Sequence, residues 1–171
     1  MTMGNKFTDE QKAMLLWKLA PGDANKVMSG QSPVPSKERI AGPEDIKEEK
    51  VSDDCCKTVR MDLHIPTSAM HELEKGHIPE MQEDHWFMYC RDGIMRWYRS
   101  WTGIRVFEAR YHKDENDYVI EDIKVTVGIP DVPLAGPQSA GDLFMVLCLA
   151  DAGADFWPSW NLYVEDLEKG E

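Results

Sequence analysis

Residues 85–111 read HWFMYCRDGIMRWYRSWTGIRVFEARY, and this stretch decides the fold. Two aromatic-rich runs are joined by Arg-Asp-Gly, in which Asp-Gly supplies the positive φ that a tight hairpin turn demands. A second turn, Trp-Thr-Gly, leads into two further apolar runs. The pattern predicts four consecutive antiparallel strands arranged as a meander. These strands are expected at 85–90, 94–100, 104–111 and 118–127.

The flanking segments carry their own signals. Thr8 begins a capping-box pattern that predicts a helix over 9–20. Residues 57–65 alternate between apolar and polar side chains, as expected of a half-buried strand. A short helix fits 67–75, and residues 141–152 are apolar nearly all round, which predicts a helix buried against the sheet. After that helix we expect only a tail, which begins at Trp157 and ends in solvent.

Together these elements predict an α+β fold. An antiparallel β-meander of four to five strands should pack against a buried C-terminal helix, with a short helix at the N-terminus. Residues 1–56 are expected to hold this first helix and an irregular, partly flexible segment, and residues 57–171 to form the compact α+β part of one domain. The irregular stretch 21–54 either wraps the surface or tethers the first helix loosely.

Composition favours an ordinary folded domain. The chain has 171 residues, of which 42% are hydrophobic, and no apolar run approaches the roughly 18 residues needed to cross a bilayer. The first ten residues are polar and carry no apolar signal region, so the expected compartment is the cytoplasm. None of the four cysteines has C-x-x-C spacing, and no two histidines share a metal-binding helical spacing. We therefore expect reduced thiols, no metal and no cofactor.

Charge is distributed unevenly along the chain. The net charge is −12, which opposes direct binding to nucleic acid or to anionic membranes. The segment from His85 to Lys113 nevertheless carries +4, and the rest of the chain carries −16. The sequence therefore contains a basic segment within an acidic protein.

This basic segment contains the candidate ligand-binding residues. Arginine offers a planar fork that matches phosphate or carboxylate, hydroxyl groups donate hydrogen bonds, and turn N–H groups can cradle an anion. A neighbouring tryptophan, Trp97 or Trp101, could stack on a base or another ring. The candidates are Arg99, Ser100, Trp101, Thr102, Gly103 and Arg105.

A purely structural interpretation of the same residues stays open. In that interpretation Trp101 fills the core, Gly103 supplies a turn conformation, and the arginines pair with the protein's own carboxylates. Strand alternation places Arg99 on the face of Trp97, where a half-buried cation needs a partner such as an internal Asp or Glu.

Three functions are compatible with these features. The first is a small binding domain that recognises a phosphate-bearing small molecule, such as a nucleotide, or another anion. The second is an acidic protein-interaction or immunity-like partner that binds a basic protein by charge complementarity. The third is an enzyme with an unrecognised site near Arg99 or His85, although no P-loop, G-x-S-x-G or G-x-G-x-x-G motif is present.

Two short motifs resemble those of an uncharacterised bacterial family. These are the W-F-x-Y strand that begins at Trp86 and the R-S-W-T-G turn that begins at Arg99, and the resemblance covers roughly residues 65–111. Segments of this kind resemble ones found beside ADP-ribosylglycohydrolase-type domains, which implies a link to ADP-ribose or nucleotide metabolism. The acidic metal motifs of the glycohydrolase are not matched, so the resemblance implies a shared small domain and assigns no catalytic residue.

Overall fold

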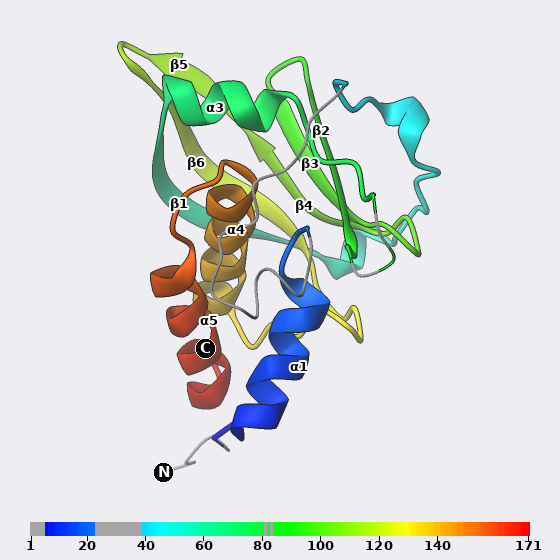
Figure 1. Ribbon diagram of the computed structural model, residues 1–171, viewed down its shortest axis with the longest axis vertical. Coiled ribbons are helices and arrows are strands. Elements are labelled where there is room, and N and C mark those ends of the chain that lie inside the picture. The colour runs from blue at the N-terminus through cyan, green and yellow to red at the C-terminus, as the bar shows by residue number, and fades with distance from the viewer. Residues whose placement is uncertain (1–5, 23–38, 81, 83) are drawn as a thin grey trace.

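An antiparallel sheet forms the centre of the protein (Figure 1). The computed structural model describes residues 6–22, 39–80, 82 and 84–171. The strand order is β1-β6-β4-β3-β2, and β5 pairs with β6 beside this path. The predicted meander and the α+β class are confirmed. The strands are β1 (Cys56–Pro66), β2 (Trp86–Arg91), β3 (Ile94–Arg99), β4 (Arg105–Arg110), β5 (His112–Asp114) and β6 (Asp117–Thr126).

Helices cover one face of the sheet. In Figure 1, α4 and α5 lie together in front of the strands, with α1 beside them and α3 across the far end. The first helix begins at the predicted capping box, in which Thr8 and Gln11 exchange side-chain and backbone hydrogen bonds. The helical elements are α1 (Asp9–Leu19), η1 (Pro43–Asp45), η2 (Asp53–Cys55), α3 (Thr67–Glu74), α4 (Pro137–Asp151) and α5 (Trp157–Lys169).

The hairpin between β2 and β3 forms as the Asp-Gly pair predicts. Asp92 and Gly93 have φ values of 55° and 74°, both in the left-handed region that this turn requires. The resulting register places Trp86 opposite Arg99 and Met88 opposite Trp97. Alternate residues of the two strands therefore face the helices, and the others face away.

The main hydrophobic core lies between the sheet and the helices. Trp86 and Trp97 pack edge to face, and Phe107 contacts Phe144 of α4 in the same way. The indole N–H of Trp86 donates to the backbone carbonyl of Leu19 at 2.7 Å. This buried hydrogen bond ties the end of α1 to the sheet, so the N-terminal helix belongs to the same core.

A smaller apolar cluster lies on the opposite face of the sheet. Phe87, Tyr89 and Tyr98 form it together with Ala41, which comes from the segment 39–50. This segment, drawn in cyan in Figure 1, runs along the side of the sheet away from α4 and α5. We call residues 39–50 the strap. Part of the predicted irregular stretch, the strap, thus packs on the sheet, while 23–38 lies outside the described residues.

The segment predicted as a C-terminal tail from Trp157 is instead a helix, because residues Trp157–Lys169 form α5. Proline at the second position suits a helix start, since the first N–H groups of a helix have no intrahelical partner. Trp160, Tyr163 and Val164 lie on one side of the helix and are buried. This spacing predicts a helix, whereas the charged residues at the end of the segment favour a solvated tail. A second difference is the short strand β5, which lies between the strands expected at 104–111 and 118–127.

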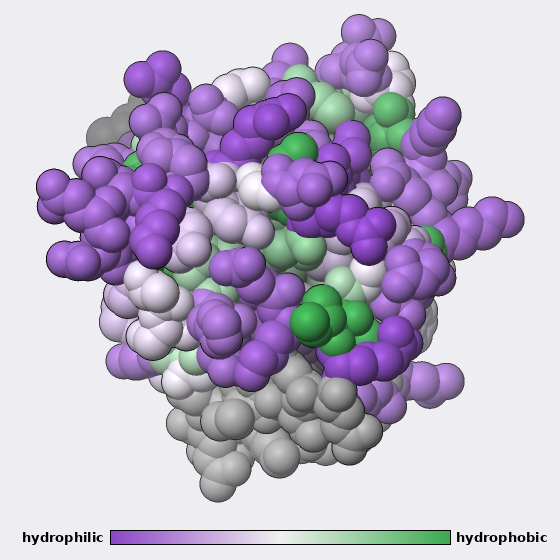
Figure 2. Space-filling view, turned by 90° about the horizontal axis from the view of Figure 1, so that it is seen from above, coloured by the Kyte–Doolittle hydropathy of each residue, from purple (hydrophilic) through white to green (hydrophobic). Residues whose placement is uncertain are grey.

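The face of the molecule drawn in Figure 2 is mostly hydrophilic. Figure 2 shows one face of the molecule, on which strongly hydrophobic residues form only small, separate patches. Such a surface agrees with a net charge of −12. Within the described part of the chain, no helix combines the length and the apolar character needed to span a membrane.

Candidate binding site

Arg99, the first predicted anion-binding residue, is buried at the end of β3. Its Nε and Nη2 donate to one carboxylate oxygen of Asp131, at 3.0 and 2.8 Å. Its Nη1 donates to the carbonyl of Lys18 at 3.1 Å, and the guanidinium lies over the ring of Trp86. Burial lowers the pKa of Arg99, and Asp131 opposes this shift. The expected internal carboxylate partner is therefore present.

Arg105 points to the other face of the sheet. It lies opposite Tyr98 in the β3–β4 register, whereas Arg99 lies opposite Trp86. Its Nη1 is 3.5 Å from Oε1 of Glu48, whose other oxygen accepts a hydrogen bond from the Tyr98 hydroxyl. The structure thus does not bring the two arginines together.

The polar groups of the turn between β3 and β4 form hydrogen bonds that stabilise the turn itself. The hydroxyl of Ser100 donates to the carbonyl of Asp84 at 3.1 Å, and that of Thr102 accepts from the N–H of Ile104 at 3.3 Å. The N–H of Gly103 donates to the carbonyl of Arg99. Both hydroxyls that were expected to bind an anion are therefore engaged within the protein. Anion binding at this turn stays a prediction.

Trp101 is the exposed aromatic residue of the candidate set. Its side chain is 68% exposed, so the interpretation that it fills the core was wrong. Its ring packs edge to face on His85, with 5.1 Å between centroids, and His85 packs in the same way on Trp17 of α1, also at 5.1 Å. We call these three residues the aromatic cluster. It joins the end of α1, the start of β2 and the β3–β4 turn.

His85 is held in the middle of the aromatic cluster and is only 7% exposed. Its Nδ1 is buried and has no hydrogen-bond partner in the described part of the chain. Burial lowers the pKa of His85, and the positive charge of Arg99 lowers it further, against weaker opposing effects of Lys18, Asp84 and Asp131. The imidazole is therefore neutral at pH 7 and carries one N–H and one lone pair.

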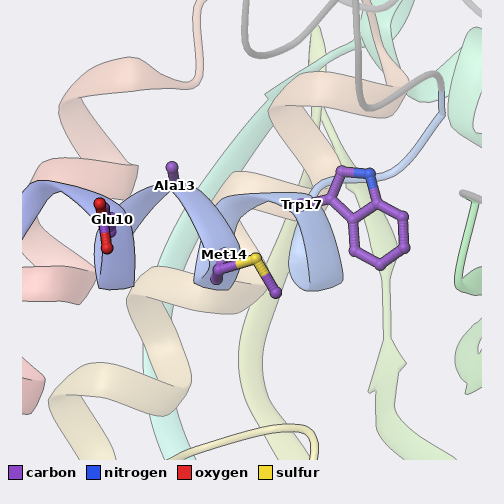
Figure 3. Close-up of a pocket in the computed structure, with 4 residues that line it drawn as sticks. All are labelled: Glu10, Ala13, Met14 and Trp17. Carbon is purple, nitrogen blue, oxygen red and sulfur yellow. The ribbon is translucent and has the colours of Figure 1, made fainter.

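A hollow of 490 Å³ adjoins the aromatic cluster along α1. The described residues that line it are Glu10, Ala13, Met14 and Trp17, which follow one another along one side of the helix (Figure 3). Met14 is exposed, and Trp17 belongs to both the hollow and the aromatic cluster. Trp17 thus links the hollow to the aromatic cluster. Sequence analysis missed it because α1 and the turn are some 80 residues apart in the chain.

A second buried histidine, His77, has a different role. Its Nδ1 is 3.0 Å from a carboxylate oxygen of Asp151 at the end of α4, and its Nε2 bonds to Asp84 just before β2. Burial by itself would lower the pKa of His77, but the charges and hydrogen bonds of the two carboxylates raise it to about 10. His77 is therefore a charged imidazolium clamped between two aspartates. No local sequence pattern predicts this triad, because its members are spread over 74 residues.

The described residues contain no group of three or more His, Cys, Asp or Glu side chains arranged to hold a metal ion. No protein-family model, curated protein or solved structure matches this chain. The functional inference therefore rests on the residues and contacts described above.

Proposed function

We propose that this chain is a small-molecule binding protein whose ligand carries a planar ring that packs on Trp101. The observation that supports this is an indole that is 68% exposed yet seated on a buried histidine. Large exposed aromatic side chains that are held in place are typical of binding surfaces, because little conformational entropy is lost when a partner packs on them. Nucleotides are the first ligand class to test, since they combine a planar base with a phosphate.

Arg105 is the arginine that would bind a phosphate group of the ligand. Its side chain is 35% exposed, whereas that of Arg99 is 3% exposed and carries the bonds to Asp131. The Arg105–Glu48 ion pair is partly exposed, and its closest N–O distance is 3.5 Å, so an incoming phosphate can compete for the guanidinium. Because Arg105 lies on the strap face of the sheet, a ligand that packs on Trp101 would reach it by passing around the β3–β4 turn.

Replacing Trp101 with alanine is expected to weaken binding of the ligand about 5- to 150-fold. Stacking of a base on an aromatic side chain contributes about 1–3 kcal/mol, which corresponds to this range. Isothermal titration calorimetry of nucleosides and nucleotides against wild type and Trp101→Ala measures the effect. If phosphate contributes, the nucleotide binds more tightly than the nucleoside, and Arg105→Ala removes only this difference.

Ile40→Ala is the matched control for this experiment. Ile40 is an apolar residue that is 69% exposed, and it belongs to the strap, outside the aromatic cluster. Its replacement should leave the dissociation constants unchanged. The proposal fails if wild type binds none of these ligands, or if Trp101→Ala and Ile40→Ala bind them equally well.

A second candidate function, docking of a basic protein, is favoured by the apolar side of α1. Exposed Met14 and the adjacent hollow offer an apolar surface, and Glu10 borders it on a protein whose net charge is −12. This combination suits a basic amphipathic helix, which brings apolar contacts and complementary charge together.

The docking candidate predicts that a lysine-rich amphipathic peptide binds at low salt and dissociates at about 0.5 M salt, because salt screens charge attraction. Met14→Ser should weaken this binding, while Leu162→Ser, at an exposed position on α5, should not. Fluorescence anisotropy of a labelled peptide measures both. Equal binding by the two variants would show that the peptide does not use the α1 surface.

A further inference from the structure

We propose that His85 selects among the ligands of the aromatic cluster: its Nδ1 accepts a hydrogen bond from an N–H or O–H group on the edge of the bound ring. The site would then prefer planar heterocycles that carry a donor, such as an amino-substituted base, over the same ring without one. This inference rests on the proposed function, because it concerns how a ligand already packed against Trp101 is distinguished.

The unpartnered Nδ1 atom of His85 is the first observation behind this assignment. Buried polar side-chain atoms nearly always have a partner, so each exception needs an explanation. In the described part of the chain only two buried side-chain atoms lack one, and the other, on Asp166 of α5, belongs to a different region. A ligand donor that reached Nδ1 would supply the missing hydrogen bond, and a ligand without one would leave the atom unsatisfied.

The surroundings of His85 determine which of its nitrogens can accept. The backbone carbonyl of Lys18, which is an acceptor only, opposes the lowering of the His85 pKa and so favours a ring N–H toward it. Since Nδ1 has no partner, the N–H that meets Lys18 is on Nε2. In the neutral imidazole the lone pair is then on Nδ1. The free position is an acceptor, and the group that completes it must be a donor.

The charged groups around the ring keep it in this neutral form. Arg99 lies on one side and disfavours a second positive charge, while Asp84 and Asp131 favour it more weakly. Burial adds to the effect of Arg99, so the pKa of His85 lies below its ordinary value of 6.5. Protonation at lower pH places a hydrogen on Nδ1 and removes the lone pair. Selection by His85 should therefore be present at neutral pH and lost in acid.

Access to Nδ1 requires a side chain to move. The atom is closed off from solvent in this structure, and the flanking rings belong to Trp17 and Trp101. Trp101 is the more exposed of the two and lies in a turn, whereas Trp17 is part of α1. A small outward shift of the indole, with the ligand ring still packed on it, would bring the edge of that ring to His85.

The test uses matched ligand pairs that differ by one amino group: adenosine against purine riboside, and cytidine against its 4-deamino analogue. We expect wild type to bind at least one amino-bearing member about 10-fold more tightly than its partner at pH 7.5. His85→Phe keeps an aromatic ring without an acceptor, so it should bind both members with the weaker affinity. His85→Asn, which restores a side-chain acceptor, should recover part of the discrimination.

The outcomes separate this inference from the proposed function. If wild type binds both members of each pair equally and Trp101→Ala weakens both, the planar-ring site stands and selection by His85 is overturned. The same conclusion follows if His85→Phe keeps the 10-fold preference, or if the preference is unchanged when wild type is titrated at acid pH. If wild type binds no member of either pair, both proposals fail. A melting curve for each variant confirms that it is folded.

Discussion

Replacing His77 with leucine is expected to lower the free energy of unfolding by about 3–5 kcal/mol, the typical cost of removing one partner from a buried ion pair. The substitution would leave Asp84 and Asp151 facing each other inside the protein without the cation between them. It would also release the end of α4 from the segment before β2. Urea denaturation of wild type and His77→Leu measures the loss.

The matched control for His77 is His64, which bridges Asp62 and Asp117 at 3.1 and 3.3 Å. The arrangement is the same, but the side chain of His64 is 50% exposed, so water screens the charges. His64→Leu should therefore change the stability by no more than about 1 kcal/mol. Similar losses for the two variants would show that the buried triad does not contribute as described.

The contribution of His77 should also depend on pH. Its pKa in the folded protein is raised from 6.5 to about 10, so the folded state holds its proton more tightly than the unfolded state. The resulting stability is fully present below pH 6.5 and is lost as the pH rises through about 10. The difference in stability between wild type and His77→Leu should shrink over this range. A difference that stays constant from pH 6 to pH 10 would contradict a charged His77.

Replacing Gly103 with alanine is expected to cost about 3 kcal/mol or more and to detach the strap from the β3–β4 turn. Gly103 has φ of 74°, and a Cβ added there would lie 2.1 Å from the backbone oxygen of Lys47. The strap would have to move, which breaks the hydrogen bond from Glu49 N to Gly103 O. Denaturation gives the stability, and faster hydrogen exchange at the amide of Glu49 reports the detachment.

Gly128→Ala separates backbone strain from contact with the strap. Gly128 also has a positive φ, 84°, but a Cβ there would meet nothing within 4 Å. Only the conformational strain remains, about 1–2 kcal/mol. If Gly103→Ala costs no more than Gly128→Ala, the close approach of the strap does not constrain the turn.

The candidate site shows why local patterns found only part of it. The run from Arg99 to Arg105 predicted one anion-binding turn. Arg105, however, lies opposite Tyr98, the neighbour of Arg99 on β3, and adjacent positions on a strand face opposite sides of a sheet. The two arginines therefore lie on different faces. A bulge in the β3–β4 pairing adds to this, since the register shifts between Trp97 and Tyr98. Neighbours in sequence were thus separated in space.

The sequence by itself determined the elements whose signals are local. The Asp-Gly pair, the Thr8 capping box and the alternation over 57–65 each depend on residues within one turn or one strand, and each prediction matches the structure. These patterns also predicted the meander, because short turns leave consecutive strands adjacent and antiparallel. The need of Arg99 for a carboxylate partner followed from its position on the inward face of a strand.

Only the tertiary structure decided which distant residues meet. Whether Trp101 is buried or exposed depends on what packs against the turn, and here it lies at the surface on His85, which in turn packs on Trp17. The clamp on His77 likewise needs Asp151 from a helix 74 residues away. Such contacts have no local periodicity, because each side chain is placed by the packing of a different element against the shared core. The aromatic cluster and the buried triad therefore become visible only when those elements have been assembled.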